Sequence, residues 1–208
     1  MDQPWDATEV VVITDDELVA LAAGAEADFW GRIVTVQAED TTDLSRAVAR
    51  GQRSLAVRGL LTKDGLPDPL LETVRSCLGL APWALASPVD DEARLDPAAA
   101  LLLVFSAGER DIAWRSDPTG THVVAPMARE QALGVLAEQL VAAKPGGPAR
   151  TAVTLANAAG QGVGGFIRSA RGIVQVDNDG VELGDPVEQV GATDLAAVQA
   201  QGSEAGAS

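Results

Sequence analysis

Hydrophobic and polar positions alternate at strand spacing in the middle of the chain. Three apolar runs there are separated by the sequences SAGERD and SDPTGT, whose Gly, Pro, Asp and Ser residues favour tight turns. The runs cover residues 99–108, 109–116 and 121–126. In the second run Ile112 and Trp114 alternate with Asp111, Ala113 and Arg115, a pattern typical of a strand with one face in water. Three strands joined by short turns predict an antiparallel meander.

Apolar positions elsewhere recur at helical spacing. After a strand-like run at 10–13, Thr14 and Glu17 have the spacing of a capping box, so a helix is expected to begin there. Three further helices are predicted over residues 41–61, 68–81 and 127–143. Within the first of these, Gly51 costs about 1 kcal/mol relative to Ala. A short β-branched run at 32–37 predicts another strand.

The last third of the chain changes character. The sequence KPGGPAR at 144–150 is the clearest linker, and short strand candidates follow over residues 151–184. From residue 185 the sequence is acidic and poor in large apolar residues, which predicts a disordered tail over 185–208. The expected fold is α+β, with an antiparallel β-meander sheet packed by amphipathic helices in a core domain over 1–143. We expect the strands of 151–184 to join the same sheet, and a separate hairpin unit is the alternative.

Charge narrows the range of partners. The 208 residues are 47% hydrophobic, enough for a substantial core, and carry a formal net charge of −15. No Lys or Arg follows Arg171, so much of the acidity belongs to the C-terminal stretch. Nucleic acid and anionic membrane surfaces are disfavoured as partners, because binding to phosphates needs clustered Lys and Arg. The scarcity of Lys relative to Arg is typical of a GC-rich bacterial source, such as an actinobacterium.

The compartment is predicted from what the sequence lacks. Cys77 is the only cysteine, so no intrachain disulfide can form. The start, MDQPWDATE, is acidic and has neither the basic region nor the apolar region of a signal peptide. No apolar stretch approaches the roughly 20 residues of a membrane span. We expect a cytoplasmic protein that does not associate with a membrane.

The stretch ANAAGQGVGGF at 156–166 contains the pattern G-x-G-x-x-G at Gly160, Gly162 and Gly165. A dinucleotide-binding turn with this pattern must lie between a strand and a helix, inside a βαβ unit. Here the segment that follows alternates like a hairpin and leaves no room for a helix of adequate length. We therefore interpret the glycines as a connection between strands, and we predict no cofactor.

The chain holds one histidine and one cysteine, which excludes a zinc site made of His and Cys. A Ser-His-Asp triad would have to use His122, and no G-x-S-x-G sequence is present to supply its serine. We expect His122 to face solvent from a strand, and Cys77 to be a buried thiol that behaves as a small hydrophobic residue. No catalytic residue is predicted.

Acidic residues occur in pairs that could bind a cation. The pairs are Asp15–Asp16, Glu39–Asp40 and Asp90–Asp91. Each lies at a helix start or in a loop, where acidic residues are ordinary, so capping is the preferred interpretation. The sequence DNDG at 177–180 resembles the start of a calcium loop, but it lacks the full spacing and the terminal Glu, which favours a tight turn. No metal site is predicted.

Three stretches of the chain resemble the EspG family, the cytosolic chaperones of mycobacterial and related type VII secretion systems. The first is VVVITDDELVALAAG, a strand that leads into a capped helix. The second runs from RAVARGQRSLAVRGLL through KDGLPDPLLETVRSCLGLAPWAL and is similar to two helices of the family with the turn between them. The third is the meander from Leu101 to Ala125 with the helix that follows. Together they cover roughly residues 8–143.

The resemblance implies binding of helical secretion substrates of the PE/PPE kind, and no catalysis. EspG proteins are longer and consist of two related halves around one antiparallel sheet. This chain has the length of about one half plus extra strands, so a reduced relative and a homodimer that rebuilds the missing half both stay open.

A contact with a partner is expected at the turn of the meander, because that turn is polar and exposed. Its residues are Ser116, Asp117, Pro118, Thr119 and Gly120. The main hypothesis is a non-enzymatic protein that chaperones an export substrate. The alternatives are a structural or regulatory protein-interaction domain unrelated to secretion, and a nucleotide-binding enzyme that uses the glycines at 160–165.

Overall fold

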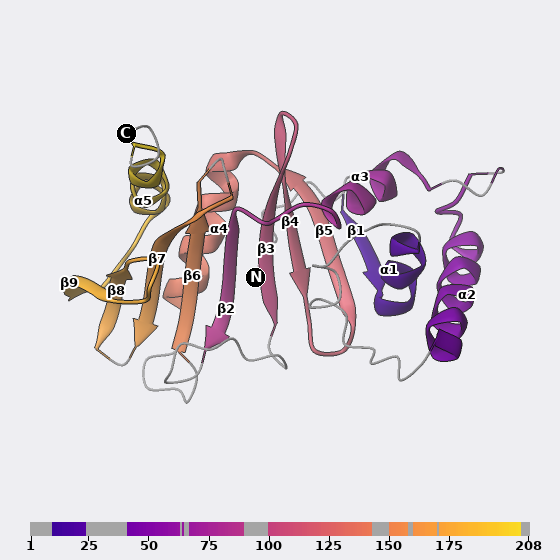
Figure 1. Cartoon of the computed structure of the whole chain (residues 1–208), viewed down its shortest axis with the longest axis horizontal. Helices are drawn as coiled ribbons and strands as arrows, with labels where there is room; N and C mark the ends of the chain where they lie inside the picture. The colour runs from indigo at the N-terminus through magenta and orange to yellow at the C-terminus, as the bar shows by residue number, and fades with distance from the viewer. Residues whose placement is uncertain are drawn as a thin grey trace. The chain divides into compact units, whose positions relative to one another are not determined.

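The computed structural model describes residues 10–23, 41–62, 64, 67–89, 100–142, 150–157, 160–169 and 171–204. The helices of these residues are α1 (Asp15–Ala22), α2 (Thr41–Val57), α3 (Pro69–Cys77), α4 (Arg129–Ala142) and α5 (Ala192–Glu204) (Figure 1). The strands are β1 (Val11–Thr14), β2 (Ala84–Val89), β3 (Leu101–Ala107), β4 (Arg110–Ser116), β5 (Thr121–Met127), β6 (Arg150–Ala156), β7 (Gly162–Ser169), β8 (Gly172–Val176) and β9 (Glu182–Val187). The predicted strand at 32–37 lies outside the described residues.

The strands of the described residues form one antiparallel sheet in the order β1-β5-β4-β3-β2-β6-β7-β8-β9. The predicted meander of three strands is present as β3, β4 and β5, and the α+β class is confirmed. The order contains a repeat: β2 to β5 run outward from β2 and lead into α4, and β6 to β9 run outward from β6 and lead into α5. Two successive four-stranded meanders, each followed by a helix, therefore make up most of the chain.

The last turn of each meander has the same hydrogen-bonding pattern. Between β4 and β5, Asp117 N–H donates to Thr121 O (3.0 Å) and Gly120 N–H to Asp117 O (3.1 Å). Between β8 and β9, Asp177 and Val181 pair in the same way at 3.0 Å, and Gly180 donates to Asp177 O at 3.1 Å. Both turns need a glycine with positive φ, 77° at Gly120 and 80° at Gly180, which a side chain would strain.

The chain divides into two compact units, one of residues 1–81 and 114–126 and the other of residues 82–113 and 127–208. We call them the N-terminal unit and the C-terminal unit. The predicted core domain over 1–143 is not one unit, because α4 packs against β6, β7 and α5. The linker predicted at 144–150 therefore does not divide the compact units, and of its residues only Arg150, which opens β6, lies within the described part.

In the N-terminal unit, β1 pairs with β5 and leads directly into α1. The predicted capping box is confirmed: Glu17 N–H donates to Thr14 Oγ1, and Thr14 N–H donates to the Glu17 carboxylate at 2.9 Å. Helices α1 and α2 approach so closely that a Cβ on Gly51 would lie 1.9 Å from the backbone oxygen of Asp16. Gly51, which costs helix propensity, thus permits this packing.

A buried carboxylate also joins these two helices. Glu17, whose side chain is fully buried, accepts hydrogen bonds from Ser54 Oγ at 2.7 Å and from Arg58 Nη1 at 2.7 and 2.9 Å. Burial raises the pKa of Glu17, but the hydrogen bonds from Ser54, the Thr14 backbone and Arg58 outweigh it, so the pKa is lowered. Arg58 Nη2 also donates to Val12 O of β1 at 2.7 Å, which ties α2 to the strand.

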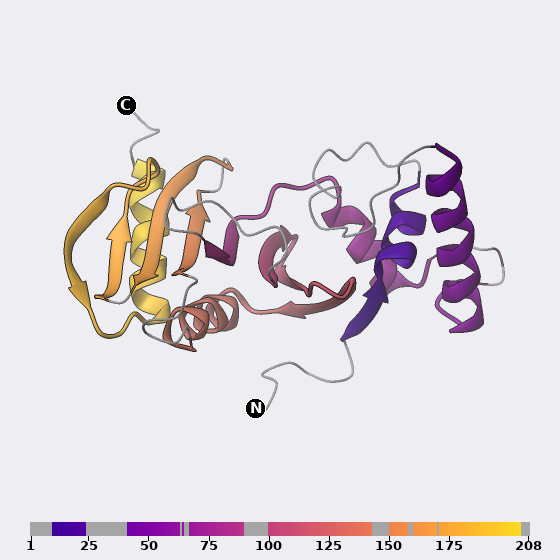
Figure 2. The same ribbon diagram turned by 90° about the horizontal axis from the view of Figure 1, so that it is seen from below.

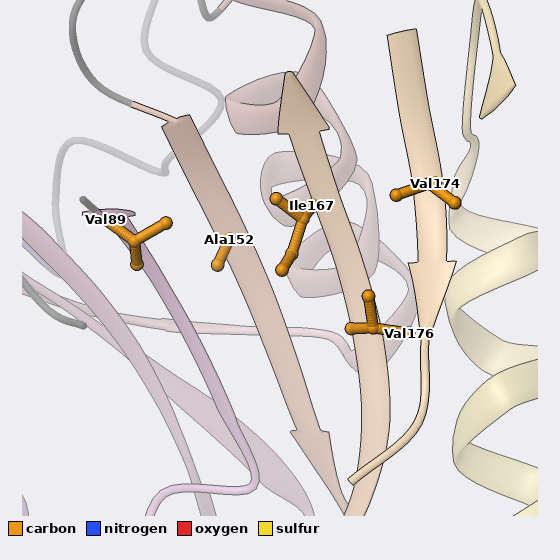
Figure 3. Packing of buried hydrophobic residues seen from close by; sticks show 5 residues of the cluster. All are labelled: Val89, Ala152, Ile167, Val174 and Val176. Carbon is orange, nitrogen blue, oxygen red and sulfur yellow. The ribbon is translucent and has the colours of Figure 1, made fainter. Parts of the chain in front are cut away.

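In the C-terminal unit, β2 pairs with β3 on one side and with β6 on the other, and β7 and β8 continue from β6. In β6, β7 and β8, consecutive residues point to opposite faces of the sheet and both are buried, as in Ala152–Val153 and Phe166–Ile167. One face carries a cluster of apolar side chains from four neighbouring strands (Figure 3). Its members are Val89, Ala152, Ile167, Val174 and Val176.

Helices α4 and α5 contact each other and both contact β6 and β7 (Figure 2). The disordered tail predicted from residue 185 is wrong over most of its length, because β9 extends to Val187 and α5 covers Ala192–Glu204. Leu195 and Val198 lie one helical turn apart and are both buried. Few apolar residues suffice here because they share one face of the helix, and residues 205–208 lie outside the described part.

Candidate functional site

The structure places the five residues of the predicted contact turn in two environments. Pro118 and Thr119 are exposed at the tip, and Asp117 is half-buried. Ser116 ends β4 and is buried, and Gly120 is buried as well. The tip of the turn is therefore accessible from outside, while its two ends belong to the interior of the N-terminal unit.

The side chain of Asp117 holds the turn in one conformation. Its Oδ1 accepts from Thr119 N–H at 2.8 Å, from Thr121 N–H at 3.3 Å and from the Thr119 hydroxyl. The pKa of Asp117 is lowered, chiefly by the hydrogen bond from the Thr119 hydroxyl; burial opposes this, and the backbone N–H groups of Thr119 and Thr121 lower the pKa further. These hydrogen bonds within the turn fix its conformation without any contribution from another molecule.

The base of the turn is fixed to α1. Gly120 O accepts from Asp15 N–H at 3.0 Å, and the Asp15 carboxylate lies 2.7 Å from Nε2 of His122. The opposite ring nitrogen, Nδ1, lies 3.2 Å from Trp114 Nε1 and 3.0 Å from Ser116 Oγ. The expectation that His122 faces solvent is wrong: its side chain is fully buried, because these polar neighbours replace water.

The hydrogen bonds decide the protonation of His122. The indole N–H of Trp114 can only donate, so Nδ1 must accept and the proton of the neutral ring lies on Nε2, which donates to Asp15. Burial lowers the pKa of His122, and the interaction with Asp15 opposes this without cancelling it. Protonation of Nδ1 would also break the hydrogen bond from Trp114, which favours the neutral ring.

Ser116, His122 and Asp15 therefore form a connected Ser-His-Asp network that the sequence did not reveal. All three side chains are buried, and Ser116 shares Nδ1 with Trp114. A nucleophile must reach a substrate, and a hydroxyl inside the core of the unit cannot do so. The network satisfies buried polar groups and fixes the turn, and that is the chemistry its geometry supports.

A second polar network surrounds the buried Asp111 in the C-terminal unit, and its cation, Arg129, is partly exposed. Asp111 accepts from Arg129 Nε at 2.6 Å, from Arg129 Nη2 at 3.0 Å and from Trp83 Nε1 at 3.1 Å. The guanidinium of Arg129 also lies 4.1 Å from the centroid of the Trp83 ring, a cation–π contact. The prediction that Asp111 and Ala113 form a wet face of β4 is wrong, since both are buried. The ion pair with Arg129 makes burial of Asp111 tolerable.

The glycines of 156–166 lie in the hairpin of β6 and β7, as predicted. Gly160 adopts a positive φ of 76° near the turn, and Gly162 and Gly165 belong to β7. A Cβ on Gly165 would lie 1.9 Å from Val153 O in the paired strand, and one on Gly162 would lie 2.1 Å from Asn178 Oδ1. The glycines let neighbouring backbones approach, and an antiparallel strand follows them where a nucleotide-binding turn requires a helix.

The acidic pair Asp15–Asp16 is engaged by the protein itself. Asp15 contacts His122, and Asp16 accepts from Arg50 at 2.6 and 2.8 Å. Asp177 caps the predicted tight turn at 177–180 through backbone N–H groups. Among the described residues no three His, Cys, Asp or Glu side chains are placed to hold a metal ion. The pairs Glu39–Asp40 and Asp90–Asp91 lie outside those residues.

Cys77 is buried, as predicted, and burial raises the pKa of its thiol to about 12. The thiol therefore stays protonated near neutral pH. Within the described ranges, no helix is long and apolar enough to cross a membrane.

Comparison with known proteins assigns the chain to no family. No family model matches the chain, and no curated protein matches it.

Proposed function

We propose that the chain is a non-enzymatic, cytosolic protein-binding protein, a chaperone of the EspG kind that holds a helical type VII secretion substrate. The observation that supports the proposal is the strand order. Two four-stranded meanders, each followed by a helix, run outward from the paired strands β2 and β6. EspG proteins have two related halves around one antiparallel sheet, and the repeat of four strands and a helix on either side of the β2–β6 pair supports a comparable plan for this chain.

The turn between β4 and β5 is the proposed contact. Its exposed tip, Pro118 and Thr119, is pre-ordered by Asp117 and fixed at its base by Asp15 and His122. A rigid loop loses little conformational entropy when a partner binds, so more of the contact energy appears as affinity. Loops held by a rigid scaffold commonly carry binding function for this reason.

Capture of the partner tests the proposal. The tagged full chain is purified from its native host, and the co-purifying proteins are identified and quantified by mass spectrometry. We expect a helical PE/PPE-like export substrate in a stoichiometric amount. Recovery of the chain alone would contradict a chaperone function. Stoichiometric recovery of a partner that is not exported would favour the alternative, a regulatory interaction domain.

A further inference from the structure

Strand β9 differs from every other strand of the described residues, because all six of its residues are exposed. It lies at the end of the strand order and pairs only with β8 there (Figure 2). By contrast, β6, β7 and β8 each bury consecutive residues, which face opposite sides of the sheet. An end strand with an unpaired edge offers its backbone N–H and C=O groups to another extended segment.

Large apolar side chains are concentrated on this exposed strand and at the residue directly before it. Val181, Leu183 and Val187 are 58%, 46% and 48% exposed. They are three of the eight large apolar residues that are exposed in the described part, and they lie within seven consecutive positions. Scattered exposed apolar residues are normal at a surface, whereas a group of them on one strand edge indicates a binding surface.

Acidic side chains are interleaved with these apolar residues. Glu182 forms salt bridges with Arg171 at 3.2 Å and with Arg150 at 3.9 Å. Asp179, Asp185 and Glu188 are exposed and have no salt bridge to any cation of the described residues. No Lys or Arg follows Arg171 in the sequence, so nothing on this strand neutralises them.

We infer that β9 is a docking strip for a cationic, β-branched extended segment of another protein, which adds to the free edge of the sheet. Val181, Leu183 and Val187 would bury its apolar side chains, and Asp179, Asp185 and Glu188 would attract its Lys or Arg residues. The inference concerns a surface separate from the turn at 117–120 and does not rest on the proposed function.

The charges also decide against a second copy of the chain as the occupant. An antiparallel pair of β9 strands centred on Asp185 would place Asp185 opposite Asp185 and Glu182 opposite Glu188 of the other copy, and like charges opposite one another destabilise a sheet. Pro186 lacks an N–H, Gly184 has a φ of 80°, and the β8–β9 register shifts between Ile173 and Gln175. Such features limit backbone pairing for any incoming strand, so the apolar and charged side chains must contribute to the docking as well.

Fluorescence anisotropy with the full chain tests this inference. The probe is a labelled peptide of alternating Lys and Val, and the reference peptides alternate Lys with Ser or Glu with Val. The test variant is L183S/V187S, and the matched control is V57S, which removes an 84% exposed apolar residue from α2 in the other unit. Because all three replaced side chains are exposed, both variants should keep the wild-type circular dichroism spectrum and Tm.

We expect the Lys-Val peptide to bind wild type and V57S equally, and L183S/V187S at least tenfold more weakly. The variant D185N/E188Q should bind several-fold more weakly and show a smaller loss of affinity with added salt. Equal binding of the Lys-Ser peptide, or unchanged binding by L183S/V187S, would overturn the inference. Self-association that requires Leu183 and Val187, without peptide binding, would overturn it in favour of a second copy.

Discussion

Nε2 of His122 lies 2.7 Å from Oδ1 of Asp15, and this contact joins β5 to the first residue of α1 across 107 positions of sequence. It connects β5, which follows the exposed turn, to α1, whose first residue also contacts the turn. The same aspartate donates its backbone N–H to Gly120 O, the last residue of the turn. Turn, strand and helix are therefore held together through one aspartate.

The neutral state of His122 predicts a pH dependence of stability. Its pKa is lowered in the folded state, so the unfolded chain takes up the proton first as the pH falls. The contribution of the neutral ring to stability is thus complete above about pH 6.5, the ordinary value for histidine, and declines below it. We expect the free energy of unfolding in urea to be lower at pH 5.5 than at pH 7.5.

His122 is the only histidine, which supplies the control for this experiment. The variant H122N should be less stable than wild type at pH 7.5. Its free energy of unfolding should differ much less between pH 5.5 and pH 7.5 than that of wild type. An H122N variant with the full wild-type difference would show that other groups cause it.

Arg58 is expected to stabilise the N-terminal unit by pairing with buried Glu17. The substitution R58M leaves a buried carboxylate without its cation, and breaking such a pair costs about 3 kcal/mol. The lowered pKa of Glu17 means that its contribution is present above about pH 4.5 and is lost as the pH falls through the folded pKa. Urea unfolding should show a smaller effect of R58M at pH 3.5 than at pH 7. An effect independent of pH would contradict the ion pair as its cause.

Two helical glycines should respond to Ala in opposite directions. At Gly51 the new Cβ would lie 1.9 Å from Asp16 O, so G51A should destabilise the protein by about 2 kcal/mol or more as the helices separate. At Gly134 in α4 no atom lies within 4 Å of such a Cβ, so G134A should stabilise by up to about 1 kcal/mol through helix propensity. Thermal unfolding measures both, and equal effects would contradict the close approach of α1 and α2.

Arg129 is expected to stabilise the C-terminal unit, because it pairs with the buried carboxylate of Asp111. R129M should cost about 3 kcal/mol, since it leaves a buried carboxylate with only Trp83 and Ser106 as polar partners among the described hydrogen bonds. The double variant D111N/R129M removes both charges and should recover part of the loss. A double variant less stable than R129M would show that Asp111 stabilises the unit in another way.

Local signals in the sequence predicted local structure well. Thr14 and Glu17 lie three positions apart, and the capping box they form was readable from the sequence. The buried networks were not readable, because their members lie far apart: Asp15 meets His122 across 107 positions, and Asp111 meets Arg129 across 18. A polar residue in an alternating strand looks exposed until its distant partner is known.

The amino-acid composition of the C-terminal stretch led to a wrong prediction, because composition does not show which residues lie side by side in the fold. A low density of apolar residues predicted disorder, but Leu195 and Val198 share a face of α5, and their spacing matters more than their number. The turn at 116–120 was predicted as a contact because it is polar and was expected to be exposed. Only its tip is exposed, because Ser116 contacts the buried His122 and Gly120 contacts Asp15, which is distant in the sequence.

The most direct test of the proposed function blocks the tip of the turn. The variant P118W places a bulky side chain at the proposed contact, and E109W places the same side chain in the exposed turn between β3 and β4. Both are used in the capture experiment, and the recovered substrate is quantified. We predict that P118W recovers at least tenfold less of a helical export substrate than wild type, while E109W recovers an equal amount. Equal recovery by P118W and E109W would contradict the claim that the substrate binds at this turn.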